Sequence, residues 1–193
     1  MRSAQQRLVP RPVARAQRTR QVAVHARRVW LFDLDNTLHD ASHAIFAHID
    51  KAMTQAVRQT LGVDAAEANA LRTKYWKRYG ATAIGMARHH GVDLGHFLRC
   101  SHDFDVAAMV RAERGLAKAL CALPGRKVLI TNAPLHYAKA VLRHLNLLRH
   151  FDSLWGIEEM RMHGEFRPKP SAALLRYVLA REGVPAARAV LVE

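Results

Sequence analysis

Residues 29–38 read VWLFDLDNTL, and this stretch decides how the chain folds. Its first four residues form a short, continuous apolar run, which is typical of a strand buried on both faces of a parallel sheet. The polar residues that follow predict a loop at the carboxyl end of that strand. Two carboxylates, Asp33 and Asp35, lie two positions apart in this loop. Ligands of open parallel sheets bind beyond the carboxyl ends of the strands, so this pair marks a candidate site.

Strands and helices are predicted to alternate in the second half of the chain. Apolar runs predict strands at 127–130, 154–157 and 189–192, and the segments 135–147 and 171–182 predict helices. This order is typical of right-handed βαβ units around a parallel sheet. We therefore predict an α/β fold with a Rossmann-like parallel sheet, in which the strand at 189–192 lies at an exposed edge.

A helical insert separates the first strand from this alternation. Apolar residues recur at helical spacing from Ile45 to Ala56, with Ser42 as the expected N-cap and Gly62 as the stop. Further helices are predicted at 65–79 and 106–123. The predicted organisation is an α/β core made of 28–41 and 113–193, a helical cap at 42–112 and a basic leader at 1–27.

The charge of the chain is concentrated at its start. The formal net charge is +14 over 193 residues, yet residues 1–28 hold eight arginines and no acid, which leaves 22 basic against 16 acidic side chains in the rest. Three interpretations of the leader stay open: a solvated segment, a nucleic-acid-binding arm and an organelle transit peptide. We expect no contact with nucleic acid except through this leader.

The remaining composition limits the class of protein. No apolar run approaches the length of a membrane helix, so we expect no membrane contact. The two cysteines, Cys100 and Cys121, cannot form a disulfide framework and fit a reducing compartment, so we expect a cytoplasmic protein. The oligomeric state stays open.

Polar side chains at three strand ends indicate the chemistry. The two carboxylates repel each other unless a cation or a shared proton lies between them. Mg²⁺ is a suitable cation, because it prefers oxygen ligands. One carboxylate can attack phosphorus, and the other can protonate the leaving oxygen and later activate water. The Thr131 hydroxyl and the Lys169 ammonium can hold phosphoryl oxygens. Glu193 follows the last strand.

Four segments in sequence order resemble the motifs of the haloacid dehalogenase superfamily. They are residues 33–38 (DLDNTL), 130–132 (ITN), 167–170 (RPKP) and 190–193 (VLVE). The resemblance covers residues 28–193, and it implies a Mg²⁺-dependent hydrolase with a helical type 1 cap after the first strand.

The resemblance also implies a role for each matching residue. Asp33 matches the nucleophile and metal ligand, and Asp35 matches the general acid and base, whose main-chain carbonyl ligates the metal. Lys169 matches the lysine that neutralises nucleophile and phosphate. Glu193 matches the first acid of the fourth motif, a metal ligand in some members. Substrate-binding positions are assigned by the same resemblance to Thr37, Thr131 and Asn132.

An acid at Asp35 favours phosphoryl transfer, because dehalogenases of the superfamily lack one there. Residues 79–82 (YGAT), 89–93 (HHGVD) and 151–158 (FDSLWGIE) resemble pyrimidine 5′-nucleotidases. The predicted substrate is thus a small phosphorylated metabolite, by preference a pyrimidine nucleoside 5′-monophosphate. A sugar-phosphate phosphatase or a phosphomutase on the same scaffold is the alternative.

The fourth motif departs from the family pattern. Its second acid has no counterpart after Glu193, so we expect a product truncated within this motif, with weakened Mg²⁺ binding. This expectation supports a rival hypothesis, in which the chain is a non-catalytic protein that binds RNA or acidic partners through its leader.

Overall fold

The computed structural model describes residues 28–193, and its centre is a parallel sheet of four strands in the order β3-β2-β1-β6. Strand β1 (Val29–Phe32) pairs with β2 (Arg126–Ile130) on one side and with β6 (Ala189–Val192) on the other. Strand β3 (Ser153–Trp155) pairs with β2. The apolar run at 29–32 thus forms an interior strand of the sheet, as its composition predicts.

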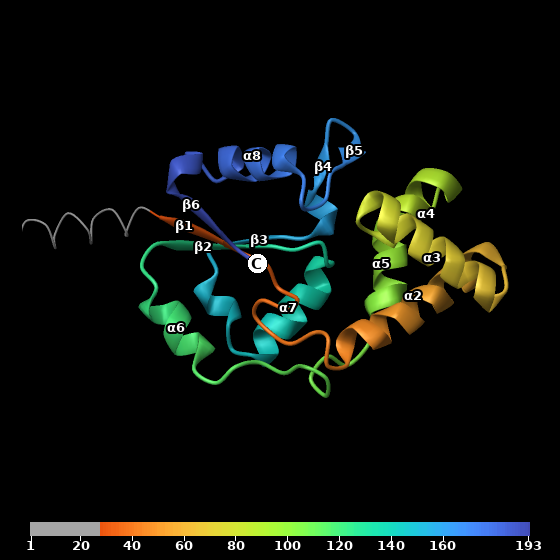
Figure 1. The fold of residues 1–193 in the computed structure, drawn as a ribbon, viewed down its shortest axis with the longest axis horizontal. Helices are drawn as coiled ribbons and strands as arrows, with labels where there is room; N and C mark the ends of the chain where they lie inside the picture. The colour runs from red at the N-terminus through yellow and green to blue at the C-terminus, as the bar shows by residue number, and fades with distance from the viewer. Residues whose placement is uncertain (1–27) are drawn as a thin grey trace, which may run out of the picture.

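Helices cover both faces of this sheet, as Figure 1 shows, with α8 (Ala172–Arg181) on one face and α6 (Leu116–Ala122) and α7 (Leu135–His144) on the other. Alternate residues of each strand point to opposite faces, so Leu31 packs in a different apolar cluster from Phe32. The Ser171 hydroxyl accepts a hydrogen bond from Leu174 N–H and begins α8, as predicted.

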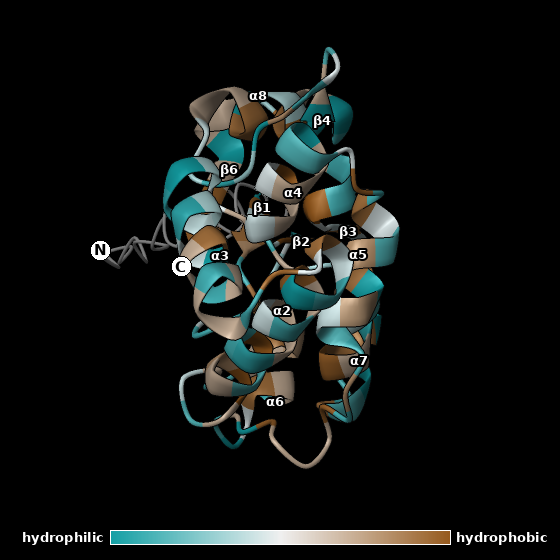
Figure 2. Cartoon of the chain, turned by 90° about the vertical axis from the view of Figure 1, so that its right-hand side faces the viewer, coloured by the Kyte–Doolittle hydropathy of each residue, from teal (hydrophilic) through white to brown (hydrophobic). Residues whose placement is uncertain are grey.

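Four helices between β1 and β2 form the insert. They are α2 (Ile45–Leu61), α3 (Ala65–Tyr79), α4 (Thr82–His90) and α5 (Leu94–His102). Viewed from the side of the insert, they lie in front of the carboxyl ends of the strands (Figure 2). Gly62 ends α2 with a φ of 69°, a left-handed conformation that glycine adopts without strain.

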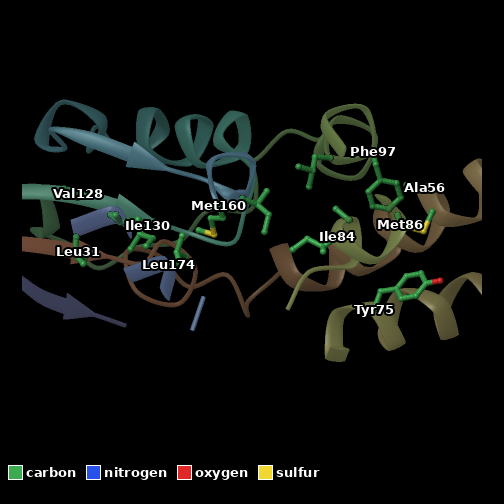
Figure 3. Close-up of a cluster of buried hydrophobic side chains, with 14 of the residues drawn as sticks. Leu31, Ala56, Tyr75, Ile84, Met86, Phe97, Val128, Ile130, Met160 and Leu174 are labelled. Atoms are coloured by element: carbon green, nitrogen blue, oxygen red, sulfur yellow. The ribbon is translucent and has the colours of Figure 1, made fainter. Parts of the chain in front are cut away.

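One apolar cluster runs from the sheet into these helices (Figure 3). At the sheet it contains Leu31 and Ile130, and among the helices it contains Met86 and Phe97, all at most 2% exposed. Burying each such side chain contributes on the order of 2 kcal/mol, and the cluster connects the helices of the insert to the sheet.

A short hairpin, β4 (Arg161–Met162) and β5 (Glu165–Phe166), and three 3-10 turns complete the described elements. The turns are η1 (Leu148–His150), η2 (Ile157–Glu159) and η3 (Ala186–Arg188).

Three sequence-based predictions of local structure were wrong. The helix expected at 106–123 is shorter, because Gly115 adopts a φ of 86° and only α6 follows it. Ser42 does not cap α2, whose N-cap is Ala44. The Ser42 hydroxyl instead accepts a hydrogen bond from the Asn36 side chain. The strand expected at 154–157 begins one residue earlier and ends at Trp155, where the η2 turn takes over.

Two further findings bear on the class of protein. No helix within residues 28–193 is long and apolar enough to cross a membrane, and both cysteines are free. The interpretations of the basic leader at 1–27 lie outside the described residues.

Glu182 joins the end of α8 to two strands. Its side chain is 8% exposed and accepts hydrogen bonds from Ser153 Oγ at 2.7 Å and Trp155 Nε1 at 2.8 Å. It also pairs with the Arg126 guanidinium. Although burial raises the pKa of Glu182, these three donors outweigh it and hold the pKa below its usual value.

Replacing Glu182 by Gln is expected to cost about 1 kcal/mol of unfolding free energy at pH 7, because the charged partner of Arg126 is lost. A carboxylate with a lowered folded pKa contributes stability above its unfolded value of 4.5, and that contribution disappears as the pH falls through the folded pKa. Urea unfolding at neutral and acidic pH measures this, and a deficit that persists unchanged below pH 4.5 would contradict it.

Candidate active site

The parallel register places two acids side by side at the end of the sheet. Phe32 pairs with Val192, so the next residues, Asp33 and Glu193, are neighbours on adjacent strands. The Asp33 N–H donates to the Val192 carbonyl at 3.0 Å, which continues the ladder by one bond. Two carboxylates are therefore brought together by backbone geometry alone.

The ammonium group of Lys169 lies between these carboxylates. Its Nζ is 2.7 Å from Asp33 Oδ2 and 2.8 Å from Glu193 Oε1, and the side chain is only 7% exposed. Burial raises the pKa of Asp33, against the opposing effect of Lys169 and of the Leu34 N–H, which donates to Asp33 Oδ1 at 2.7 Å. Lys169 thus places one positive charge against both carboxylates.

Asn132 holds the main chain of Lys169 in place. Its amide oxygen accepts from Lys169 N–H at 2.8 Å, and its amide nitrogen donates to the Lys169 carbonyl at 3.1 Å. The preceding residue, Thr131, is buried, and its hydroxyl accepts from Ala133 N–H at 3.1 Å. The end of β2 is thereby tied to the loop that carries the lysine.

The loop after β1 turns sharply at Asn36, whose φ is 58°. The Asn36 side-chain oxygen accepts from the N–H groups of Ala41 and Ser42, at 3.0 and 3.1 Å. Asparagine tolerates this left-handed conformation and stabilises turns through its own side chain. The turn leaves Asp33, Asp35 and Thr37 facing one cavity.

Asp35 is held by two residues to which the sequence analysis assigned no role. Tyr137 Oη donates to Asp35 Oδ1 at 2.7 Å, and His39 Nε2 lies 2.9 Å from the same oxygen. Burial, followed by the nearby Asp35 charge, raises the pKa of Tyr137.

His102 also lines the cavity. Burial, with a smaller contribution from His136, lowers the pKa of His102 to about 4.

The sequence carries a local signal for His39 but none for the contact of Tyr137 with Asp35. His39 stands four positions after Asp35 in the same loop, and Tyr137 lies in the first turn of the helix that follows Asn132. Tyr137 and Asp35 are 102 positions apart in the sequence, so only the packed fold shows their contact.

All seven residues predicted for the site line one cavity of about 820 Å³. They are Asp33, Asp35, Thr37, Thr131, Asn132, Lys169 and Glu193. The opposite wall comes from the cap and includes Phe46, Met53 and Trp76. On that wall Arg72 Nη1 pairs with Asp50 Oδ1 at 2.6 Å and ties α3 to α2.

The donor set suits a hard cation in number and type. Mg²⁺ commonly takes one or two carboxylates and completes its shell with waters and substrate phosphate. Asp33 and Glu193 already converge on one cationic group, Lys169, and residues 28–193 hold no group of three or more His, Cys, Asp or Glu side chains arranged for a metal. Two carboxylates are therefore what the described chain offers.

Several residues in the segments that resemble pyrimidine 5′-nucleotidases make contacts that stabilise the fold. Thr82 donates its hydroxyl to the Arg72 carbonyl, and Asp93 accepts from His96 N–H and caps α5. Gly85 on α4 lies between the first two of these segments; a Cβ there would lie 2.2 Å from the Tyr75 ring, so only glycine lets α4 pack against α3. Glu158 accepts from Leu135 N–H at the start of α7. These residues bear on the fold and leave the substrate open.

Comparison with known proteins agrees with this architecture. A family model described as haloacid dehalogenase-like hydrolase matches residues 28–193, so the chain belongs to that family. It is similar to a phosphoglycolate phosphatase from Pseudomonas syringae pv. tomato, with 28% identity over 178 residues that cover 84% of this chain and 60% of the relative. A 68-residue match, 31% identical, relates 35% of the chain to 21% of Phosphate metabolism protein 8 from Saccharomyces cerevisiae.

Among solved structures, CbbY from Rhodobacter sphaeroides, determined in complex with phosphate, is similar in fold. It has a TM-score of 0.57 and 20% identity, with 86% of this chain and 76% of that chain covered. The chain thus spans about three fifths of one curated relative and about one fifth of the other.

Replacing Asn132 by Ala removes two hydrogen bonds to the Lys169 main chain and should lower the unfolding free energy by about 1–3 kcal/mol. The exposed side chain of Gln59 on α2, for which we find no hydrogen-bond partner within residues 28–193, provides the control, and Gln59→Ala should stay within about 0.5 kcal/mol of the wild type. Urea unfolding measures both, and equal stability of the two variants would show that Asn132 does not hold the loop.

Proposed function

We propose that the chain is a Mg²⁺-dependent phosphomonoester hydrolase that works through an aspartyl-phosphate intermediate. One observation carries the proposal: Asp33, with Lys169 on its Oδ2, and Asp35 line the same cavity beneath the cap. A nucleophile needs a charged partner to stay ionised when buried, and a second acid within reach must handle the proton.

In the first half of the reaction, a carboxylate oxygen of Asp33 bonds to phosphorus while the bond from phosphorus to the leaving oxygen breaks. Asp35 gives its proton to that oxygen, so an alcohol departs. Lys169 and the Thr131–Asn132 segment bind the phosphoryl oxygens, whose charge needs stabilisation in the transition state.

In the second half, Asp35 takes a proton from water. The water oxygen bonds to phosphorus, the bond to Asp33 breaks, and phosphate leaves. The enzyme returns to its starting protonation state. Asp33, Glu193 and the main-chain carbonyl of Asp35 would hold Mg²⁺, which would supply positive charge against the phosphoryl oxygens.

For the substrate we propose a small phosphorylated metabolite, by preference a pyrimidine nucleoside 5′-monophosphate. Two of the three exposed large apolar side chains in the described chain, Phe46 and Trp76, line the cavity opposite the acids. An exposed aromatic at a cavity wall suits a flat ring in the leaving group. A sugar phosphate is the alternative substrate.

For the location we propose the cytoplasm, which the two free cysteines support.

Phosphate release from UMP with and without Mg²⁺ tests the reaction. Asp33→Asn keeps the size of the side chain and removes the nucleophile, so we expect a loss of at least about 10³-fold with the fold retained by circular dichroism. Turnover by a folded Asp33→Asn variant would overturn the mechanism. A panel with sugar phosphates and phosphoglycolate separates the substrate classes.

Trp76→Ala tests the leaving-group wall. If a base stacks there, its loss should raise KM for UMP about tenfold and leave kcat within about twofold, because stacking contributes about 1–3 kcal/mol per base. The control is Lys77→Ala, the next residue of α3, which lies outside the cavity lining. Equal KM values for wild type and Trp76→Ala would instead favour a small sugar phosphate.

A further inference from the structure

The carboxylate of Asp35 is used asymmetrically. Its Oδ1 contacts Tyr137 Oη at 2.7 Å and His39 Nε2 at 2.9 Å, and we find no hydrogen bond to its Oδ2 from residues 28–193. Asp35 lines the cavity, whereas Tyr137 and His39 are 1% and 4% exposed and do not line it. One oxygen is therefore anchored toward the interior, and the other is left for chemistry.

The direction of both hydrogen bonds follows from burial. A hydroxyl donates to a carboxylate oxygen, so Tyr137 is a donor. The second nitrogen of His39, Nδ1, is buried and has no partner in the described structure. A proton there would be a buried donor without an acceptor, which costs about 1–3 kcal/mol, whereas a bare Nδ1 loses less. His39 thus carries a proton on Nε2 and donates it to Asp35 Oδ1.

We propose that Tyr137 and His39 are positioning residues for Asp35, which hold it by Oδ1 so that Oδ2 exchanges the proton with the leaving oxygen and later with water. This inference rests on the proposed function of Asp35. Two donors on one oxygen occupy both of its lone-pair directions. The proton that Asp35 transfers must therefore reside on Oδ2, the oxygen that neither Tyr137 nor His39 contacts.

Packing holds Tyr137 in place without its hydroxyl. Its ring lies 5.7 Å from the His102 ring and 6.0 Å from the Phe104 ring, measured between centroids. Phe at position 137 can keep these contacts and lose only the bond to Asp35. Tyr137→Phe is therefore a sharp probe of positioning.

The test compares two substrates that differ in their need for a proton. The nucleoside oxygen of UMP leaves only when protonated, whereas p-nitrophenolate leaves as a stable anion. For Tyr137→Phe, we expect kcat/KM to fall about tenfold or more with UMP and to stay within about twofold with p-nitrophenyl phosphate, since acid catalysis contributes about 10²–10⁴-fold. Because kcat/KM reports the first chemical step, water activation does not enter it.

Two further variants separate the possible outcomes. Asp35→Asn should show the same split between substrates, only larger; without that split Asp35 is not the acid, and the proposed function fails. If Asp35→Asn shows the split and Tyr137→Phe does not, the positioning inference is overturned while the proposed function stands. Tyr177→Phe on α8, whose ring packs edge-on against Trp155, is the matched control and should leave both substrates unchanged.

A spectroscopic readout needs no turnover. Nitrogen-15 NMR of the imidazole rings, with the His39 signals assigned by their loss in His39→Gln, should show Nε2 protonated and Nδ1 bare near neutral pH. Asp35→Ala removes the acceptor and should shift the Nε2 signal. A His39 ring that is protonated at Nδ1, or that does not respond to Asp35→Ala, overturns the inference whatever the activity.

Discussion

The site depends on one ion pair network at the end of the sheet. The parallel register of β1 and β6 forces Asp33 and Glu193 into adjacent positions, where two negative charges repel each other. The ammonium of Lys169 lies within 2.8 Å of both carboxylates and offsets this repulsion. Asn132 fixes the main chain of that lysine, so the end of β2 also enters the same network.

The strand pattern could be predicted because burial dictates it. A run such as Val29–Phe32 with no polar side chain favours a buried strand, and polar residues at its end then mark the rim of the sheet. The candidate residues from Asp33 to Glu193 line one cavity for that reason. Helices with strong stop signals, such as Gly62, were also predicted, because their ends depend on local backbone conformation.

The missed features depend on contacts between distant segments. Tyr137 reaches Asp35 only when α7 packs beneath the β1 loop, and no local pattern encodes that contact. The helix predicted at 106–123 was too long for another reason: Gly115 adopts a left-handed conformation, which overrides the helical propensity of the segment. Ser42 has a capping side chain, yet Asn36 uses it to close the turn instead.

In the proposed function, the cap contributes one wall of the cavity and the sheet contributes the acids. The cap shares an apolar core with the sheet, so its cavity-lining residues, such as Trp76, are held opposite the acids. Closing such a site excludes water, which strengthens the electrostatic contribution of Lys169. The sheet and the cap thus line opposite sides of one cavity.

The most direct measurement of the central claim is the covalent state of Asp33 during turnover. Acid-quenching the chain after mixing with Mg²⁺ and UMP, followed by peptide mass spectrometry, should find phosphate on the peptide that contains Asp33, and Asp33→Asn should carry none. Steady phosphate release with no phosphorylated peptide at any quench time would contradict an aspartyl-phosphate mechanism.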